Sequence, residues 1–344
     1  MSTYLMRPAE LTDLEALMTL AEQSGAGFTS LPVDEGILQD KLKKSVAAFK
    51  GDLAIAQTGK FLLMLEAAET GKIVGCSAVK AGTGVGEPFF NYRIITVAQA
   101  SHAADKRFDL DALVLTNEFV GYTEVGTLFV QAEHRGGGVG RLAAQSRYLL
   151  MAAQPEQFGD NVLAELRGVI DANGDTPFWD CLGRHFFKMS FTEADHLCAV
   201  SDNQFILDLM PKFPIYIDLL PPHAREVIGR CHNEGVGAMK LLEWEGFRFE
   251  RTVDIFDGGP MLAARREHIR TIRESRRVRV AAGYVDDGRK VRGLISTDNF
   301  NEFRVMNFDG FLDGNGNAVC SKELLEHLGL SQNDTARVWI KSDG

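Results

Sequence analysis

The pattern of apolar and polar residues is most informative around one segment, Glu124–Tyr148. Thr127–Val130 is a short apolar run of the kind that predicts a strand. The glycine-rich stretch Arg135–Gly140 follows, and the residues after it are rich in Leu, Ala and Arg, which favours a helix. We therefore expect a central strand, a tight glycine turn and a helix in direct succession.

The residues before this segment predict a strand, two helices and a hairpin. Tyr4–Arg7 is the first strand, and Thr12 with Glu15 forms a capping box at the start of a helix that ends near Gly25. A second helix is expected at Asp34–Phe49, because apolar residues recur on one of its faces. Further strands are predicted at residues 61–66, 73–79, 89–96, 113–115 and 161–167, the first two joined as a hairpin at residues 69–71.

Two later segments share an order of helix, glycine and aromatic residue. In the first, Thr176 is the N-cap of a short helix that ends at Gly183, and an aromatic strand starts at Phe186. The second is Ala238–Phe247, with its glycine at position 246. A degenerate second half of the fold would explain this similarity, and two unrelated helix C-caps explain it equally well.

From about Arg276 the chain changes to short β-type runs separated by Gly, Asn and Asp, with one helix at Lys322–Leu328. This texture predicts a small β-rich subdomain, such as a barrel. Asp313–Asn317 has some calcium-loop character, but the glycine required at loop position six is Ala318, so we expect a tight hairpin turn instead.

Composition narrows the classes of function. The 344 residues are enough for more than one domain, and the formal charge of -10 argues against nucleic acid or an anionic membrane as the main partner. The five cysteines are scattered without C-x-x-C spacing, so we expect neither a disulfide framework nor a metal site. No leader or membrane-spanning run is evident, and a cytoplasmic location is the default expectation.

The glycine turn has the chemistry of an anion site. Glycines at such a turn let backbone N–H groups and the positive end of the helix dipole face one anion. The Walker pattern fails because Arg141 and Leu142 follow the last glycine, and the dinucleotide spacing is also wrong. The pattern Arg-x-x-Gly-x-Gly at residues 135, 138 and 140 resembles the acyl-CoA pyrophosphate loop of the GNAT acyltransferase superfamily. A plain surface turn is the alternative.

Several segments together resemble the arginine N-succinyltransferase family, which is related to GNAT enzymes. They include GAGFTSLP, TEVGTLFV and ELRGVID, and they follow the family's order over roughly residues 4–275. The matching segments are residues 25–32, 90–93, 123–130, 165–171, 176–189, 209–216, 227–232 and 245–260. The resemblance implies an α+β fold with a GNAT-like, mostly antiparallel mixed sheet flanked by helices. The β-rich C-terminal subdomain resembles the family more loosely, and a second, degenerate GNAT-like half rests on the repeated order of helix, glycine and aromatic residue alone.

The resemblance also implies the reaction, which is transfer of a succinyl group from succinyl-CoA to the α-amine of L-arginine during arginine catabolism. An amine attacking a thioester needs a neutral nitrogen, a polarised carbonyl and a proton for the leaving thiolate, but no protein nucleophile. His232 matches the family's proton donor, and Leu128 matches its succinyl-CoA residue. Leu128 can also be a core side chain, because a contact made through its backbone leaves the side chain free to pack.

Glu124 starts the central strand, where many GNAT enzymes place the carboxylate that deprotonates the amine. A salt bridge or a contact to the substrate guanidinium are the alternatives for this residue. We expect two groups of residues to bind the coenzyme. The pantetheine arm would contact Leu128, Phe129 and Val130, and the pyrophosphate would contact Arg135, Gly136, Gly137, Gly138, Val139 and Gly140.

Other charged side chains must meet the ends of the two substrates. Candidates for the guanidinium are Glu165, Asp171, Asp254 and Asp257, and candidates for the succinyl carboxylate are Arg93 and Arg167. Within enzymes, an ornithine-preferring acyltransferase or one subunit of a two-chain enzyme is the rival hypothesis. A catalytically silent subunit that binds acyl-CoA or arginine is the rival from another class.

We expect three parts in the chain. These are a GNAT-like acyl-CoA-binding domain at residues 1–200, an α/β portion with the proton donor at 201–275, and the β-rich subdomain at 276–344. No metal, nucleic acid or membrane partner is expected, and the chain is predicted to act as a homo-oligomer or as a heterodimer with a paralogous subunit.

Overall fold

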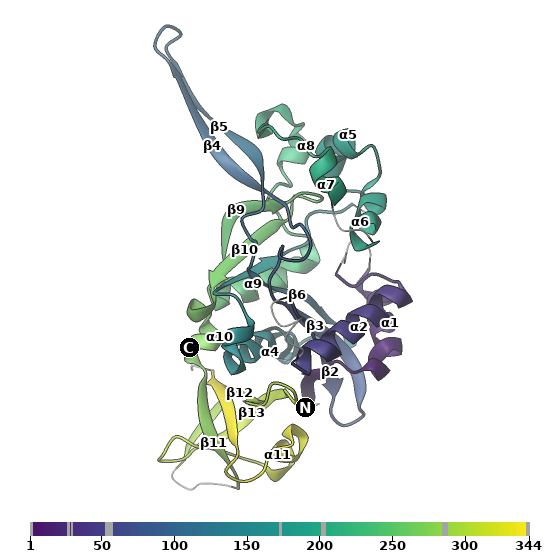
Figure 1. Ribbon diagram of the computed structural model, residues 1–344. Helices are drawn as coiled ribbons and strands as arrows, with labels where there is room; N and C mark the ends of the chain where they lie inside the picture. The colour runs from purple at the N-terminus through teal and green to yellow at the C-terminus, as the bar shows by residue number, and fades with distance from the viewer. Residues whose placement is uncertain are drawn as a thin grey trace.

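The computed structural model describes residues 3–25, 28, 30–51, 58–171, 174–200, 204–283 and 288–341, without the side chains of residues 195, 199 and 200. These residues form an α+β fold around a mixed, mostly antiparallel sheet (Figure 1). The strands follow the spatial order β12-β15-β11-β14-β13-β1-β2-β3-β6-β7-β10-β9-β4-β5-β8. The loop expected at residues 25–32 lies partly outside the described residues.

The strands are β1 Tyr4–Pro8, β2 Lys60–Ala67, β3 Lys72–Lys80, β4 Asn91–Ser101, β5 Lys106–Thr116, β6 Thr123–Val130, β7 Asn161–Glu165, β8 Ile215–Tyr216, β9 Arg248–Asp254, β10 Pro260–Arg265, β11 Arg276–Ala282, β12 Arg289–Thr297, β13 Val305–Leu312, β14 Ala318–Cys320 and β15 Thr335–Ile340. The α-helices are α1 Leu14–Ser24, α2 Glu35–Phe49, α4 Val139–Ala153, α5 Arg184–Phe187, α6 Phe191–Val200, α7 Gln204–Leu209, α8 Pro222–Arg225, α9 Val236–Glu245, α10 Arg270–Glu274 and α11 Lys322–Leu328.

Helices cover both faces of the central strands. Successive residues of β2 point to opposite sides, as the two-residue period of a strand requires. Leu62 packs in a cluster with α1 and α2, whereas Leu63 packs in a second cluster with α4. The strand-turn-helix expected at Glu124–Tyr148 is confirmed as β6, the glycine turn and α4, with α4 almost entirely buried.

The last five strands close into a ring. Strand β12 pairs with both β15 and β13, and β11 and β14 complete the circuit between them. Their inward side chains make a separate apolar cluster that includes Ile295, Phe308 and Val338. Strand β13 also pairs with β1, so this ring is joined to the central sheet by hydrogen bonds. Asp313–Asn317 forms the expected tight turn, between β13 and β14.

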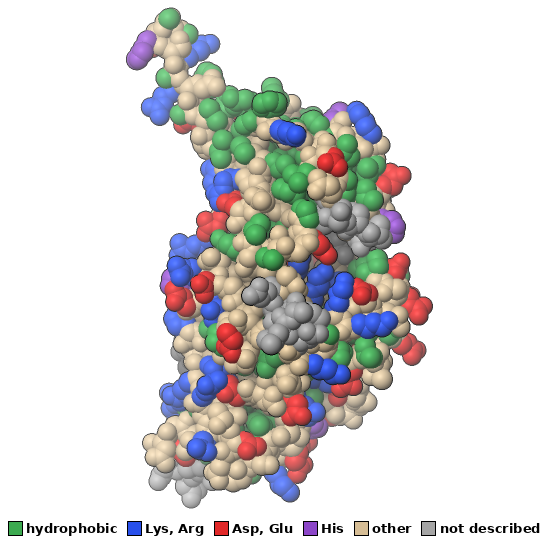
Figure 2. Space-filling view, viewed as in Figure 1, with side chains coloured by type: hydrophobic (Ala, Val, Ile, Leu, Met, Phe, Trp, Pro, Cys, Tyr) green, Lys and Arg blue, Asp and Glu red, His purple; other side chains and the backbone are tan. Residues whose placement is uncertain are grey.

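A long hairpin leaves the body of the protein. Strands β4 and β5 pair from Asn91 opposite Thr116 out to Ser101 opposite Lys106, and Figure 1 shows their tip projecting away from every other element. Near its base, Figure 2 shows hydrophobic side chains gathered on the surface. Phe213 and Leu219, which flank β8 beside this hairpin, are 84% and 80% exposed.

The predicted strands at 89–96 and 113–115 are therefore too short. The residues of the outer hairpin are almost all exposed, so no buried face imposes an alternating pattern on them. Strand β14 was not predicted at all, because its three residues are buried on both sides and give no period.

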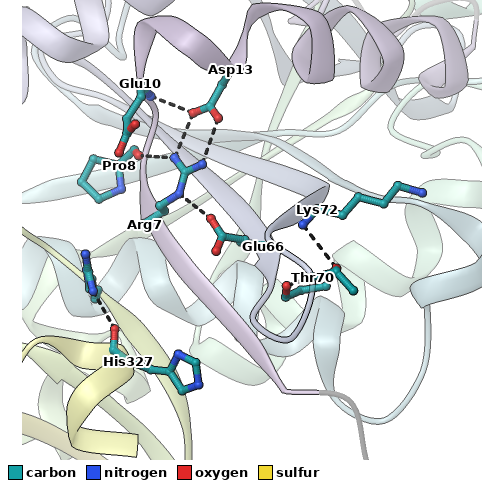
Figure 3. A network of polar contacts seen from close by, with 10 residues as sticks. Arg7, Pro8, Glu10, Asp13, Glu66, Thr70, Lys72 and His327 are labelled. Carbon is teal, nitrogen blue, oxygen red and sulfur yellow. Dashed lines mark hydrogen bonds and ion pairs between the residues drawn. The ribbon is translucent and has the colours of Figure 1, made fainter. Parts of the chain in front are cut away.

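The predicted capping box at Thr12 and Glu15 is wrong. Asp13 is the residue that reaches back, and its carboxylate accepts the N–H of Glu10 at 2.8 Å. The same carboxylate receives both Nη atoms of Arg7 at 2.9 Å, and Arg7 Nε donates to Glu66 at 2.7 Å (Figure 3). Asp13 therefore caps the helical turn and also anchors it to β1 and β2.

The predicted helix end at Gly183 is also wrong. The Thr176 cap is confirmed, since its Oγ1 accepts the N–H of Trp179 at 3.3 Å. However, Gly183 is helical at φ -56, and the helical conformation continues through Phe187 into a left-handed Lys188. Glycine is needed there for space, because a Cβ would lie 2.1 Å from the Trp179 ring. Gly246 is a left-handed C-cap at φ 105, so the two helix-glycine-aromatic segments differ in structure.

Among the described residues, none of the helices is long and apolar enough to cross a membrane.

Candidate active site

The central strand β6 is kinked at Thr127. This residue has φ 50, which is a rare conformation for a β-branched side chain and a form of stored strain. Two residues of β6 between Gly126 and Phe129 face a single residue of β3, which is a β-bulge. Gly75 lets the strands cross closely here, because a Cβ on it would lie 2.5 Å from the Phe129 carbonyl oxygen. The bulge turns the backbone that follows away from a regular ladder.

Beyond Glu124, β6 separates from its parallel neighbour β7. The two strands pair only at Thr123 with Val162 and at Glu124 with Leu163. On its other edge β7 pairs with β10 along its whole length, and β6 pairs with β3 on its own far edge. The edge of β6 toward β7 therefore has no strand partner from Val125 to Val130 among the described residues.

The glycine turn forms an open cradle at the start of α4. Gly136, Gly137 and Gly138 have φ values of 103, 56 and 90, a run that other residues would adopt only with strain. A Cβ on any of them would meet nothing within 4 Å, so conformation and not space demands glycine. In the described part of the chain, the N–H groups of Gly138, Gly140 and Arg141 have no acceptor. These free amides and the dipole of a 15-residue helix are the components of an anion site.

Arg135 lies between this turn and the strand. Its Nε donates to the Val130 carbonyl at 2.9 Å, and its guanidinium carbon lies 5.8 Å from the centre of the Phe129 ring. The residue is otherwise exposed, so its Nη atoms face solvent. Val139 begins α4 and is buried in the same apolar cluster as Val130, with Leu128 packed against it. Leu128 is thus partly a core side chain, which is one of the two roles that the sequence analysis allowed for it.

His232 is held at the end of β7. Its backbone N–H donates to the Arg167 carbonyl at 2.8 Å, and its Nδ1 lies 2.8 Å from Arg167 Nη2 and 3.3 Å from the N–H of Glu234. Both neighbours are donors, so Nδ1 must be the acceptor and the neutral ring carries its proton on Nε2. Burial first, and then the guanidinium of Arg167, lowers the pKa of His232 below its ordinary value. The residue is therefore a neutral imidazole whose Nε2–H has no partner among the described residues.

Glu124 lines a cavity on the face of the sheet that α2 covers. The cavity has a volume of about 150 Å³, and Gly126 and Thr127 of the kinked strand also line it. Its remaining charged lining residues are lysines from three elements, Lys41, Lys60 and Lys80. No ion pair or hydrogen bond of the Glu124 side chain occurs among the described residues, so the salt bridge considered for it is absent there.

Three carboxylates gather near the same strands. Glu165 ends β7. Asp254, the last residue of β9, and Asp257, in the turn between β9 and β10, lie beside it. Asp257 accepts the N–H groups of Gly168 at 2.6 Å and Gly259 at 2.7 Å. Burial first, and then the charge of Asp254, raises the pKa of Asp257 to about 8. The pKa of Glu165 is raised well above its ordinary value, first by burial and then by the charges of Asp254 and Glu124. Such a cluster favours a cation.

The other charged candidates lie differently. Arg93 is on the outer hairpin strand β4, where Glu118 accepts its Nε at 2.9 Å. Asp171 accepts the N–H of Asp175 in a turn at 3.0 Å. Arg167 contacts His232 and Glu234. Among the described residues, no group of three or more His, Cys, Asp or Glu could hold a metal ion.

The structure brings the predicted residues together in two sets. Glu124 shares the lysine-lined cavity with Gly126 and Thr127. Leu128, Val130 and Val139 belong to the large apolar core of the central sheet, and Cys231, the residue before His232, packs against the same core. The sequence analysis missed the lysines. Next to the turn Ala67 pairs with Lys72, a register that would place Lys60 opposite Val79, and only the irregularity between Leu65 and Glu66 brings Lys60 opposite Lys80.

Comparison with known proteins gives one consistent result. The family described as arginine N-succinyltransferase beta subunit matches residues 4–271. Proteins named arginine N-succinyltransferase from Escherichia fergusonii and from Enterobacter sp. are each 41% identical over 302 residues, which is 88% of this chain and 88% of theirs. The solved structure of arginine/ornithine succinyltransferase subunit AI from Pseudomonas aeruginosa is 32% identical, covers 99% of both chains and has a TM-score of 0.89. The chain belongs to the arginine N-succinyltransferase family.

Proposed function

We propose that this protein transfers the succinyl group of succinyl-CoA to the α-amine of L-arginine in arginine catabolism, by direct attack in a ternary complex. The observation that carries the proposal is 41% identity, over most of both chains, to relatives named arginine N-succinyltransferase. The separation of β6 from β7 beside an open glycine cradle supports it, because this arrangement suits a coenzyme thioester.

The coenzyme would lie along the free edge of β6. Backbone groups of Leu128, Phe129 and Val130 would hold the pantetheine arm as an added strand does. The amides from Gly136 to Gly140 would take the pyrophosphate, with the Arg135 guanidinium beside them. This is a GNAT-type way of binding acyl-CoA, and the free N–H groups at the start of α4 are what supports it here.

The reaction forms one bond and breaks one. The arginine nitrogen attacks the thioester carbon, the C–N bond forms, and the C–S bond breaks as the tetrahedral intermediate collapses. Glu124, directly or through a water, takes the proton that the amine loses. Coenzyme A leaves as a thiol, so one proton passes from the amine to the sulfur overall.

His232 would act at the leaving group. Its Nε2–H has no partner in the described part of the chain, whereas Nδ1 accepts from Arg167 and from the N–H of Glu234. A fixed donor stabilises the charge that develops on sulfur or on the carbonyl oxygen as the thioester reacts. Arg167 is therefore a positioning residue for the imidazole, and this contact argues against a role for it at the succinyl carboxylate.

Glu165 is our choice among the four acidic candidates for the guanidinium. Asp254 and Asp257 already accept backbone N–H groups, whereas Glu165 has no hydrogen bond among the described residues. Burial and the neighbouring carboxylates raise the pKa of Glu165, so a guanidinium placed beside it would favour its ionised form. The guanidinium of arginine supplies such a cation with two parallel donors.

We further propose a cytoplasmic enzyme that assembles as a homo-oligomer or with a paralogous subunit. The projecting β4–β5 hairpin and the exposed Phe213 and Leu219 support an assembly surface. The division into parts at residues 200 and 275 stays a prediction, and so does a second GNAT-like half. Light scattering of the purified chain tests the assembly, and a monomer at working concentration would contradict the homo-oligomer.

The function is tested by thiol release from succinyl-CoA with the purified single chain. We expect release that depends on arginine and is slower with ornithine, with succinylarginine identified by mass spectrometry. Faster turnover on ornithine would support the ornithine-preferring enzyme instead. Binding of both substrates without thiol release would support the silent regulatory subunit.

A further inference from the structure

A row of three charged side chains crosses the sheet beside the proposed active site. Lys60 of β2 lies directly opposite Lys80 of β3, and Lys80 lies directly opposite Glu124 of β6. Residues in direct cross-strand register point to the same face of a sheet, so the three side chains are neighbours. Two like charges directly opposite each other are destabilising, which makes the lysine pair unfavourable for the fold alone.

A third lysine reaches the row from the helix above it. Lys41 lies on α2, and its Nζ donates to the Ser30 carbonyl. Burial first, and then the ammonium of Lys60, lowers the pKa of Lys41 to about 8. The four side chains of Lys41, Lys60, Lys80 and Glu124 line the cavity of about 150 Å³, and Lys60 and Lys80 also line an adjoining cavity of about 250 Å³.

This charge arrangement is incomplete without an anion. Three potential cations face Glu124, with the exposed Glu87 near Lys60 at the adjoining cavity, and no ion pair of these lysines occurs among the described residues. The chain as a whole carries a formal charge of -10, so acidic partners for lysines are plentiful elsewhere. Buried or half-buried cations that have no carboxylate partner among the described residues are costly, and ligand-binding sites are where such a cost is offset.

The cavity also adjoins the part of β6 along which the thioester would lie in the proposed function. Gly126 and Thr127 line it, and they follow the point at which β6 leaves β7. The volume of the cavity exceeds the ~30 Å³ share of a single water in the liquid. The reaction brings two carboxylates close to the thioester carbon, one at the end of the succinyl group and one on the α-carbon of arginine.

We propose that Lys41, Lys60 and Lys80 form a carboxylate subsite that selects a carboxylate-bearing substrate. The inference rests on the proposed function, because that function supplies the carboxylates. The subsite explains how an enzyme could prefer a succinyl group to an acetyl group, or arginine to its decarboxylated analogue agmatine. The experiment below separates these two sources of the same chemistry.

The test compares Lys41→Met, Lys60→Met and Lys80→Met with Lys43→Met, an exposed lysine on the same helix that lines neither cavity. For each variant, kcat/KM is measured for succinyl-CoA against acetyl-CoA with arginine, and for arginine against agmatine with succinyl-CoA. We expect one of the two preferences to fall by at least about tenfold, the size of one lost charge-assisted contact. A fall in the acyl preference assigns the site to succinate, and a fall in the acceptor preference assigns it to arginine.

Both preferences unchanged in all three variants, with an active wild-type chain, would overturn the subsite while leaving the proposed function intact. A wild-type chain without succinyl transfer would instead overturn the function. Lys60→Arg is the fold control, since it keeps the charge and should keep most of the preference.

Calorimetry supplies a readout that does not need turnover. The groups that face Lys41 are Lys60, Lys80, Glu124 and the Cys76 thiol. A bound carboxylate raises the pKa of Lys41 from about 8, so binding near pH 8 should take up protons. Titrations in two buffers of different ionisation enthalpy, with succinyl-CoA and then with arginine, measure this uptake. No uptake in the wild type for either ligand, or equal uptake in Lys41→Met, would contradict the subsite.

Discussion

His232 combines a structural contact with a free chemical group. Its Nδ1 accepts from Arg167 and from the backbone of Glu234, which fixes the ring and its tautomer. Nε2–H is then the only polar atom of the ring left for a ligand. A histidine after a helix is often structural, and this one caps a 3-10 turn as well. Both roles fit the same geometry, because each uses a different nitrogen.

Replacement of His232 by Gln should lower kcat by about 100-fold or more, the usual contribution of a positioned acid or base. Affinity for succinyl-CoA should change little, because the proposed coenzyme contacts lie on β6 and α4. His268→Gln, at an exposed site, is the control. Unchanged turnover in His232→Gln would remove this residue from the mechanism.

The pH profile should identify the form of the imidazole that acts. Burial and Arg167 lower the pKa of His232, so the neutral Nε2–H form prevails above about pH 6.5. Activity that depends on this form should hold or rise from pH 6.5 to pH 8, and the acidic limb assigned to His232 should disappear in the Gln variant. A fall in wild-type activity across this range that the Gln variant lacks would indicate the imidazolium.

Asp257 should make the fold less stable as pH rises. Its pKa is raised to about 8 in the folded chain from an ordinary value of 3.8, so the folded state binds more protons than the unfolded state between these values. The stabilisation that this carboxyl group contributes is fully present below its pKa in the unfolded state, and it is lost as the pH rises through its pKa of about 8 in the folded state. Denaturant unfolding at pH 5.5, 7 and 8.5 should therefore show a decline that Asp257→Asn reduces. The same slope in both proteins would show that Asp257 does not cause it.

At the scale of elements, the junction of β6 with α4 is the part that sequence predicts best. A strand period, three glycines and a helix period follow one another without interruption in Glu124–Tyr148, so each local preference agrees with the fold. Helices α2 and α11 were predicted for the same reason. Gly183 was misassigned because sequence does not show whether a glycine is needed for its backbone angle or for its small size.

A side chain in the glycine turn should reduce the affinity for coenzyme A more than it reduces the stability of the fold. Gly138→Ala puts a Cβ at φ 90 with nothing nearby, so unfolding should cost about 1 kcal/mol less. Affinity for coenzyme A should fall by more than this strain explains, about tenfold, because the methyl group enters the amide cradle. Gly71→Ala, with φ 69 in an open hairpin turn, is the matched control and should keep full affinity. Equal affinities in the two variants would argue against the cradle.

At the scale of the whole molecule, β1 joins the C-terminal ring to the central sheet, and Arg7 on β1 fixes α1 to that junction (Figure 3). Arg7→Met leaves the carboxylates of Asp13 and Glu66 without their cation, at sites where their side chains are only 7% and 20% exposed. We expect a loss of about 3 kcal/mol in unfolding free energy, typical of one partner removed from a buried pair. Lys44→Met, which breaks an exposed pair with Asp40, should cost less than about 1 kcal/mol. Similar losses in both variants would contradict the anchoring role.

The contacts of the site that join residues distant in the sequence could not be predicted in this way. Lys41, Lys60 and Lys80 lie on a helix and two strands, and only the register of β2 with β3 and the position of α2 unite them. The pairing of β7 with β10, one hundred residues later, likewise brings the acidic cluster to Glu165. Periodicity predicts elements, whereas these contacts depend on which elements become neighbours.

The most direct test of the account is a crystal structure of the protein with coenzyme A and succinylarginine. We expect the diphosphate on the amides of Gly136 to Gly140, the pantetheine arm along Leu128–Val130, and the sulfur within hydrogen-bond reach of His232 Nε2. A coenzyme bound away from the β6–α4 junction, or a sulfur remote from His232, would contradict the account.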